Sequence, residues 1–263
     1  MINDDSYHTP AETRRYLLDR LLPGLLVAFR PRLIYITVKA RQKAVRNRYA
    51  DQDWIDSSHD TIRLLERCGA RFHITGVENL RKARKPMVII SNHMSTLETL
   101  AFPGLIAPHM KLTFVVKEGL VKDYLFGPVM RSRNPILVSR HNSREDLMEV
   151  MTKGQKLLSE GCSICLFPQS TRKPDVKPEE FNSLGVKLAA RAGVQVVPVA
   201  IKTDFWKNGK RIKELGRLDR KQEVHIRFGE PMDIKGSGKE ENQAIIKFIQ
   251  DNLNRWRDGQ LGN

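Results

Sequence analysis

The chain has 263 residues, of which 40% are apolar, 29% charged and 7% aromatic. That length and apolar content allow one large buried core, which excludes a disordered tail and a small disulfide-stabilised scaffold. The formal net charge of +15 is unevenly placed: residues 14–48 contain ten Lys or Arg and one acid, and residues 206–221 contain seven and two. The sequence therefore predicts a nearly neutral body with two strongly basic segments.

Short apolar runs separated by arginines fill the first basic segment. The longest run without a charge, residues 21–29, has nine residues, whereas a membrane-spanning helix needs about 20. Pro23, Gly24 and Pro31 interrupt the pattern. Such segments favour helices that lie in the headgroup layer of a membrane, the alternative being a helical hairpin packed on the body. We expect residues 1–60 to form a basic amphipathic helical region and residues 61–263 an α/β domain.

Apolar runs alternate with helical patterns along the rest of the chain. The runs predict strands near residues 71–75, 87–91, 112–117, 135–139, 162–167, 194–201 and 223–228. Asn142 and Asn182 are expected to cap helices that end at Gly161 and Gly193, and residues 245–256 have helical spacing. This order predicts an α/β fold: a largely parallel or mixed sheet of about seven strands with helices on both faces, plus the N-terminal helical region.

The predicted strand at 87–91 leads into a turn that carries an imidazole and a carboxylate. His93 and Glu98 are five positions apart, a rotation of about 140° on a continuous helix, so they can meet only if His93 precedes the helix. Ser95 or Thr96 would cap that helix. Ligand sites of open α/β sheets lie at the carboxyl ends of strands. A carboxylate-oriented imidazole suits a general base near neutral pH, and a core histidine bonded to the backbone is the alternative.

A second polar cluster follows the predicted strand at 162–167. Its members are Phe167, Pro168, Gln169, Ser170, Thr171 and Arg172. A guanidinium beside hydroxyls and loop amides provides the donors that bind a phosphate group. An ordinary exit from the strand with a solvated arginine is the alternative.

Together, the two clusters resemble the glycerolipid acyltransferase family, typified by 1-acylglycerol-3-phosphate acyltransferases. The family's hallmarks are Asn-His with an acidic residue five places after the histidine, followed by Phe-Pro-Glu-Gly-Thr-Arg. The resemblance covers roughly residues 70–235 and includes weaker blocks at residues 136–140 and 197–201, in the family's order. Glutamate at position 98 replaces the commoner aspartate, and Gln169 and Ser170 replace glutamate and glycine. The lost carboxylate at 169 is expected to leave Arg172 freer to pair with an anionic headgroup.

The resemblance implies a glycerol-3-phosphate acyltransferase-like fold and a direct acyl transfer. A fatty acyl group would move from a thioester of coenzyme A or acyl carrier protein to the free hydroxyl of a lysophospholipid, with 1-acylglycerol-3-phosphate as the first choice, in phospholipid biosynthesis. His93 with Glu98 would be the general base, and Arg140 and Arg172 would bind the acceptor phosphate with help from Lys117. The other residues expected to contact substrate are Asn92, Ser95, Phe167, Pro168, Gln169, Ser170 and Thr171.

No metal site and no cofactor beyond the thioester co-substrate are expected, because His8, His59, His109 and His141 have no acidic partner at a telling spacing. For Lys117 and Arg140 the alternative is a solvated cation at a strand end. Three cysteines, an odd number, and an N-terminus without a secretory pattern indicate the reducing cytosol. We therefore expect a peripheral protein on the inner face of the membrane.

Trp206 begins the second basic segment. An indole beside cations suits an anionic lipid surface, where each basic residue contributes about 1 kcal/mol. The same charge would attract an acidic acyl carrier protein or the phosphates of coenzyme A. Other possibilities are a different acceptor, a non-catalytic lipid-binding relative and, less favoured, a nucleic-acid-binding protein. The last explains the charge, but no recognised nucleic-acid motif accompanies it.

Overall fold

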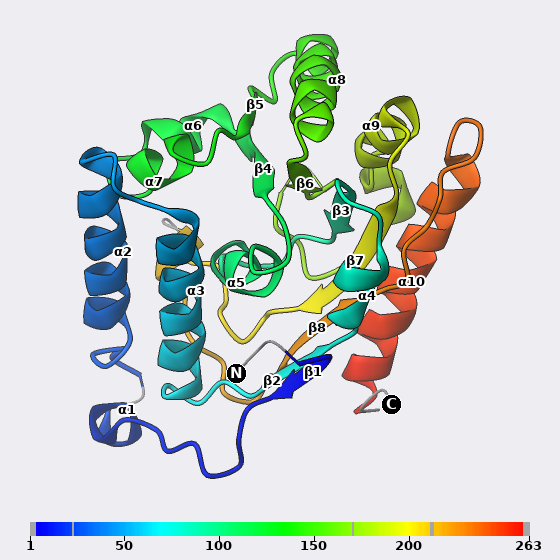
Figure 1. The fold of residues 1–263 in the computed structure, drawn as a ribbon. Helices are drawn as coiled ribbons and strands as arrows, with labels where there is room; N and C mark the ends of the chain where they lie inside the picture. Colours follow the sequence, from blue (N-terminus) through cyan, green and yellow to red (C-terminus); the bar gives the residue numbers. More distant parts are fainter. Residues whose placement is uncertain (1–3, 23, 170, 211–212, 260–263) are drawn as a thin grey trace.

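The computed structural model of the protein describes residues 4–22, 24–169, 171–210 and 213–259. An eight-stranded mixed sheet in the order β1-β2-β8-β7-β3-β6-β4-β5 forms its centre (Figure 1). The strands are β1 (Ser6–His8), β2 (Phe72–Thr75), β3 (Val88–Ser91), β4 (Leu112–Lys117), β5 (Ile136–Val138), β6 (Ser163–Leu166), β7 (Val196–Lys202) and β8 (Val224–Phe228). The pairs β1–β2 and β7–β8 are antiparallel, and the other neighbouring pairs are parallel.

This architecture confirms the predicted α/β class, with one strand more than the seven expected. The additional strand, β1, has three residues and no alternating apolar pattern, so its sequence gives no strand signal. Side chains from and beside β1 tie it to the body: the hydroxyls of Tyr7 and Thr9 each donate a 2.7 Å hydrogen bond to Glu66. The edge strand therefore depends on long-range contacts.

Helices cover both faces of the sheet, as predicted (Figure 1). One layer contains α2 (Arg30–Val45), α3 (Asp51–Glu66), α5 (Leu97–Ile106) and α7 (Gly127–Arg131), and the other contains α8 (Ser143–Ser159), α9 (Leu184–Ala192) and α10 (Lys239–Arg257). The shorter helices are α1 (Leu17–Leu21), α4 (Glu78–Lys82) and α6 (Glu118–Lys122), with 3₁₀ turns at Pro178–Glu180 and Lys213–Leu215. The Asn142 side chain caps α8 as expected, and Gly193 ends α9 with a φ of 65°.

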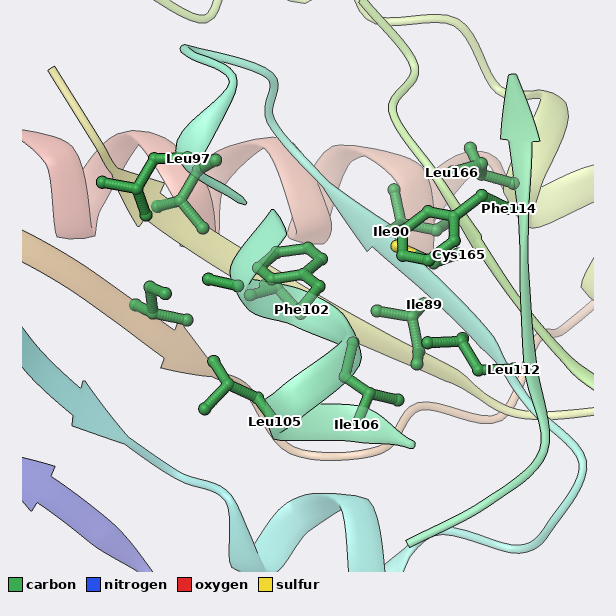
Figure 2. Close-up of a cluster of buried hydrophobic side chains, with 14 of the residues drawn as sticks. Ile89, Ile90, Leu97, Phe102, Leu105, Ile106, Leu112, Phe114, Cys165 and Leu166 are labelled. Atoms are coloured by element: carbon green, nitrogen blue, oxygen red, sulfur yellow. The ribbon is translucent and has the colours of Figure 1, made fainter. Parts of the chain in front are cut away.

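The central strand β3 is buried on both faces, which explains its uninterrupted apolar sequence. Ile90 faces α9, where a Cβ on Gly185 would lie 2.7 Å from the terminal methyl of Ile90 and would force that side chain to shift. Ile89 faces α5, and Figure 2 shows Ile106 of α5 pointing toward it. Strand and helices therefore hold the carboxyl end of β3 rigidly.

Helix α5 is buried at eight of its ten positions because it lies between the sheet and α3. Next to its Pro103, the hydroxyl of Ser58 of α3 lies within hydrogen-bond distance of the carbonyls of Leu100 and Ala101, at 2.6 and 2.9 Å. Ser58 also accepts from the amide of Gly104 at 2.8 Å. These contacts fix the axis of α5 and, with it, the first turn that carries the predicted carboxylate.

The N-terminal region forms part of this helical layer, in which α2 packs against α3. The buried face of α2 consists of Leu33, Thr37, Ala40 and Ala44. The expected boundary at residue 60 falls inside α3, which continues from Asp51 to Glu66. No helix in the described ranges is both long enough and apolar enough to cross a membrane.

Candidate active site

Parallel pairing brings the predicted residues to one edge of the sheet. Ile90 of β3 is level with Leu166 of β6, and Lys117 of β4 is level with Val138 of β5. The segments that follow these four strands, and the one that follows β7, therefore emerge side by side. This is the edge at which open α/β sheets bind ligands.

His93 lies in the turn between β3 and α5, and its side chain meets Glu98 as predicted. Nδ1 of His93 is 2.9 Å from Oε1 of Glu98, with the imidazole 12% exposed and the carboxylate fully buried. A carboxylate can only accept here, so Nδ1 carries the proton and Nε2 becomes the acceptor nitrogen. Within the described part of the chain Nε2 makes no hydrogen bond, which leaves it for a substrate hydroxyl.

The Glu98 carboxylate is held by five donors. Oε1 accepts from His93 and from the amides of Met94 and Ser95 at 2.7 Å, and Oε2 accepts from the hydroxyls of Ser95 and Thr203 at 3.0 and 2.7 Å. Burial acts to raise the pKa of Glu98, but the hydrogen bond and charge of His93, with the hydrogen bond from Thr203, outweigh it and lower the pKa. The carboxylate is therefore ionised at neutral pH and stabilises an imidazolium.

Asn92 and Ser95, which we expected to contact substrate, lie behind the site. Asn92 is fully buried and forms two 2.9 Å hydrogen bonds with the backbone of Ile201, one to the carbonyl and one from the amide. Ser95 is 1% exposed, and its hydroxyl accepts from the amide of Leu97, the first residue of α5, at 3.0 Å. Both residues therefore hold the turn, and their polar atoms face protein.

Thr203, at the carboxyl end of β7, is absent from the expected site residues. Its hydroxyl is 3.1 Å from that of Ser95 and donates to Glu98. The only sequence signal for Thr203 is its position two residues after the strand predicted at 194–201. The parallel pairing of β7 with β3 brings that position to the same edge of the sheet.

Phe167 stacks on the imidazole of His93, with ring centroids 4.4 Å apart and planes 22° apart. Phe102 and Phe114 extend this stack behind Phe167 at 5.9 and 6.5 Å. The carbonyl of the next residue, Pro168, accepts a hydrogen bond from Asn182. Phe167 thus fixes the plane of the ring, a positioning role that sequence alone did not indicate.

Gln169 joins the two clusters. It is 1% exposed; its side-chain oxygen accepts from the His93 amide, and its side-chain nitrogen donates to the Asp175 carbonyl, both at 2.9 Å. The backbone amide of Lys173 also donates to the His93 carbonyl at 2.9 Å. An ionised glutamate could not donate to Asp175, so the amide suits this position. Gln169 therefore supports the turn, and Ser170 lies outside the described residues.

Arg172 is paired within the protein, contrary to the expectation that the loss of a carboxylate at 169 would free it. Its Nη1 is 3.0 Å from Oε1 of Glu214, and the arginine side chain is 15% exposed. The neighbouring Thr171 accepts a hydrogen bond from Lys213 at 3.0 Å. The carboxylate that neutralises Arg172 thus comes from a distant segment.

Arg140 and Lys117 lie at the carboxyl ends of β5 and β4, both exposed. Arg140 has a φ of 63°, and its amide donates to Asp146 at 2.8 Å. Partial desolvation lowers the pKa of Arg140; Asp146 opposes this and the charge of Arg172 adds to it. The two arginines therefore lie within electrostatic reach of each other, as a shared anion site requires.

Trp206, expected at a membrane surface, is instead buried. It is 1% exposed and packs edge-to-face on Phe29, with centroids 4.9 Å apart. The indole therefore joins the second basic segment to the N-terminal region.

An imidazole backed by a buried carboxylate, next to two arginines on an α/β sheet, is typical of transferases that activate a hydroxyl group near an anion. The family model described as Acyltransferase matches residues 71–202. The chain belongs to this acyltransferase family and is an acyltransferase.

Relatives agree with this assignment. A protein of Pseudomonas aeruginosa named 1-acyl-sn-glycerol-3-phosphate acyltransferase is 29% identical over 206 residues, which are 78% of this chain and 74% of the relative. A Mycoplasma pneumoniae protein named as a probable enzyme of that kind is 26% identical, over 72% of this chain and 70% of its own. The crystal structure of the 1-acyl-sn-glycerophosphate (LPA) acyltransferase PlsC from Thermotoga maritima has the same fold, with a TM-score of 0.64 and 19% identity over 94% of this chain and 96% of its own.

Proposed function

We propose that the protein transfers a fatty acyl group from an acyl thioester to the free hydroxyl of 1-acylglycerol-3-phosphate, a step of phospholipid biosynthesis. The observation that carries the proposal is the 2.9 Å contact between His93 and a fully buried Glu98 at the carboxyl edge of the sheet. The printed names of the Pseudomonas and Mycoplasma relatives support the acceptor.

In this mechanism Nε2 of His93 takes the proton from the lysolipid hydroxyl as its oxygen attacks the thioester carbonyl. The new ester forms, the carbon–sulfur bond breaks, and the imidazolium returns the proton to the departing thiolate. Glu98 stabilises the imidazolium between these steps, and Phe167 holds the ring plane. A positioned base contributes about 10² to 10⁴ in rate. The proposal needs no metal ion or cofactor besides the thioester.

The acceptor phosphate would bind to Arg172 and Arg140, with Lys117 at the rim. Guanidiniums bind phosphate oxygens through two parallel N–H donors, which fixes the headgroup and places the hydroxyl. The charge of Arg172 helps to lower the pKa of Arg140, which supports a location of both arginines within reach of one anion. The donor carrier, coenzyme A or acyl carrier protein, is distinguished by the assay below.

A membrane surface is the proposed partner of the N-terminal region, on the inner face of the membrane. Exposed leucines gather on and beside α1; they are Leu17, Leu18, Leu21, Leu22 and Leu25, with 44–66% of each exposed. Arginines flank these leucines in the sequence of residues 14–48. Apolar side chains flanked by cations insert into an anionic headgroup layer, where a lysolipid would be collected.

The test is to incubate the purified protein with a panel of lysolipids and with acyl thioesters of coenzyme A and of acyl carrier protein. Products are identified by mass spectrometry, and we expect phosphatidic acid from 1-acylglycerol-3-phosphate. His93→Ala and Glu98→Gln should lower turnover by at least about 10² while circular dichroism stays unchanged. Normal turnover by a folded His93→Ala variant would exclude the mechanism. Product from another lysolipid alone would replace the acceptor.

A further inference from the structure

The connection between β7 and β8 folds back as a hairpin, residues 205–219, of which 211 and 212 lie outside the described ranges. Its stem is held by backbone hydrogen bonds from Asp219 to Phe205 at 2.6 Å and from Lys207 to Arg217 at 2.9 Å. A β-bridge pairs Trp206 with Leu218. The stem is therefore a fixed base for the residues that follow Lys207.

The 205–219 hairpin contacts both clusters of the active site. Asn208 donates to the carbonyl of Met94, next to His93, at 2.9 Å. At the far end, the hairpin contacts the segment that follows β6, residues 167–172, which we call the phosphate loop. Lys213 donates to Thr171 and Glu214 pairs with Arg172, each at 3.0 Å. Glu214, the acid among these hairpin residues, forms an ion pair with Arg172, the arginine proposed to bind the acceptor phosphate.

A carboxylate and a phosphate bind a guanidinium through the same N–H groups, so they compete for Arg172. The two partners of the pair differ in exposure. The Arg172 side chain is 15% exposed, whereas that of Glu214 is 36% exposed. Glu214 is therefore the member that can turn into water, while Arg172 stays in the site.

We propose that Glu214 is an internal competitor for the acceptor's phosphate group, which it mimics on Arg172 until a phosphate displaces it. The inference rests on the proposed function in one respect, that Arg172 binds the acceptor. Glu214 prevents Arg172 from standing unpaired in a nearly buried position, and it sets the affinity for the acceptor. Glu214 does not discriminate between acceptors, because the free energy needed to displace it from Arg172 is the same for every phosphate-bearing ligand.

The equal cost of displacing Glu214 predicts a measurable pattern in the affinities of different phosphate-bearing ligands. Glu214→Gln keeps the size of the side chain and removes its charge, so every phosphate-bearing ligand of Arg172 should bind more tightly by one common factor, about fivefold for a partly exposed pair. Turnover at saturation should be unchanged, because the competitor is displaced in the complex. A residue that contacts the headgroup would instead change affinities by different factors for different acceptors.

The competing explanation is that loss of any ion pair loosens the hairpin. Asp219→Asn is the matched control, because Asp219 lies in the same hairpin and pairs with Lys207 at 2.7 Å, away from the phosphate loop. Loosening would give both variants the same phenotype. Competition would confine the effect to Glu214→Gln.

The experiment uses the full-length wild type and both variants at one ionic strength. It measures kcat and KM with 1-acylglycerol-3-phosphate and with a lysophosphatidylglycerol, and the Kd of glycerol 3-phosphate by calorimetry. We expect Glu214→Gln to lower both KM values and the Kd by the same factor at constant kcat, and Asp219→Asn to match the wild type. Unchanged affinities, factors that differ between ligands, or an equal change in Asp219→Asn would each overturn the inference.

The calorimetry separates this inference from the proposed function. Absence of acyl transfer by the wild type with all acceptors would refute the proposed function, and the Kd values of glycerol 3-phosphate would still decide whether Glu214 competes for phosphate. In an Arg172→Gln background, Glu214→Gln should have no effect on that Kd. A persistent effect there would place the competition at another cation and overturn the assignment to Arg172.

Discussion

The hydroxyl of Thr203 donates a 2.7 Å hydrogen bond to Oε2 of Glu98, a residue 105 positions earlier in the chain. The two carboxylate oxygens of Glu98 therefore have different partners: Oε1 contacts His93, and Oε2 accepts from the hydroxyls of Thr203 and Ser95. Two fixed oxygens define the plane of the carboxylate. That plane directs the His93 ring.

Thr203→Val should lower kcat while the protein stays folded. The substitution keeps the shape and removes a hydrogen bond to a charged group, worth about 1.5–3 kcal/mol. If part of that energy orients the carboxylate, kcat falls about tenfold. Thr203→Ser should restore most of it, which steady-state kinetics of both variants would check. Full activity in Thr203→Val would show that the other donors suffice to orient Glu98.

Gln169→Glu, which introduces the glutamate usual in the family, should destabilise this protein at neutral pH. An ionised carboxylate would still accept from His93, but its second oxygen would face the Asp175 carbonyl, where the amide now donates. An unpaired buried acceptor costs about 1–3 kcal/mol. Urea unfolding would measure the loss.

The deficit of Gln169→Glu should shrink as the pH falls, because a protonated carboxyl can donate to Asp175 again. Gln243→Glu, on the exposed face of α10, is the control and should be neutral. Equal stability of Gln169→Glu and the wild type at pH 8 would contradict the role given to the amide.

Replacing Leu21 and Leu25 by glutamate should weaken binding to anionic vesicles. The two leucines are 66% and 63% exposed, and burial of each in the headgroup layer would contribute about 1.5 kcal/mol or more. The partition coefficient calculated from the fraction that sediments with vesicles should therefore fall at least about tenfold. Met148→Glu on α8 is the matched control, since Met148 is 62% exposed on another surface. An equal loss of vesicle binding in the Leu21 and Leu25 double variant and in Met148→Glu would indicate that the protein binds vesicles through its charge alone.

Acid should unfold the protein partly through His225. This residue of β8 stacks between His73 and Trp256, with centroids 4.9 and 5.0 Å apart. Burial, and then the charges of His73, Lys202 and His8, lower the pKa of His225 to about 3 from 6.5. Between pH 6.5 and pH 3, His225 is protonated in the unfolded chain and neutral in the folded protein. The free energy of unfolding therefore falls as the pH drops below 6.5 and continues to fall toward pH 3.

The slope from such a group is at most about 1.4 kcal/mol per pH unit. His225→Phe keeps the ring stack and should flatten the dependence of unfolding free energy on pH between 6.5 and 4, measured by urea titration. His141→Phe, in an exposed turn, should leave the slope as it is. A wild-type slope in His225→Phe would assign the acid sensitivity to other groups.

Local patterns made most of the body predictable. Each of the seven expected strands is present within two residues of its predicted bounds, because buried parallel strands have continuous apolar sequences. The Asn142 cap and the Gly193 ending of α9 follow from short-range hydrogen bonding and backbone geometry. The meeting of His93 and Glu98 also followed from local geometry, since their spacing excluded a continuous helix.

Contacts between distant segments were not predictable. Thr203, the pairing of Arg172 with Glu214 and the burial of Trp206 against Phe29 all depend on how strands and loops meet in space. The roles of buried polar residues were misjudged for the same reason. Asn92 and Ser95 carry the family's polar pattern, and only their partners reveal that they support the turn.

The clamp between Asn92 and Ile201 has a consequence for synthesis on the ribosome. A nascent chain that has emerged to residue 190 already contains His93, Glu98 and Arg172, but it lacks β7, which pairs beside β3 and supports this turn. The base can therefore be oriented only after the translated chain has passed Thr203. Truncated translation products would carry the motifs of the enzyme and leave acyl thioesters unconsumed.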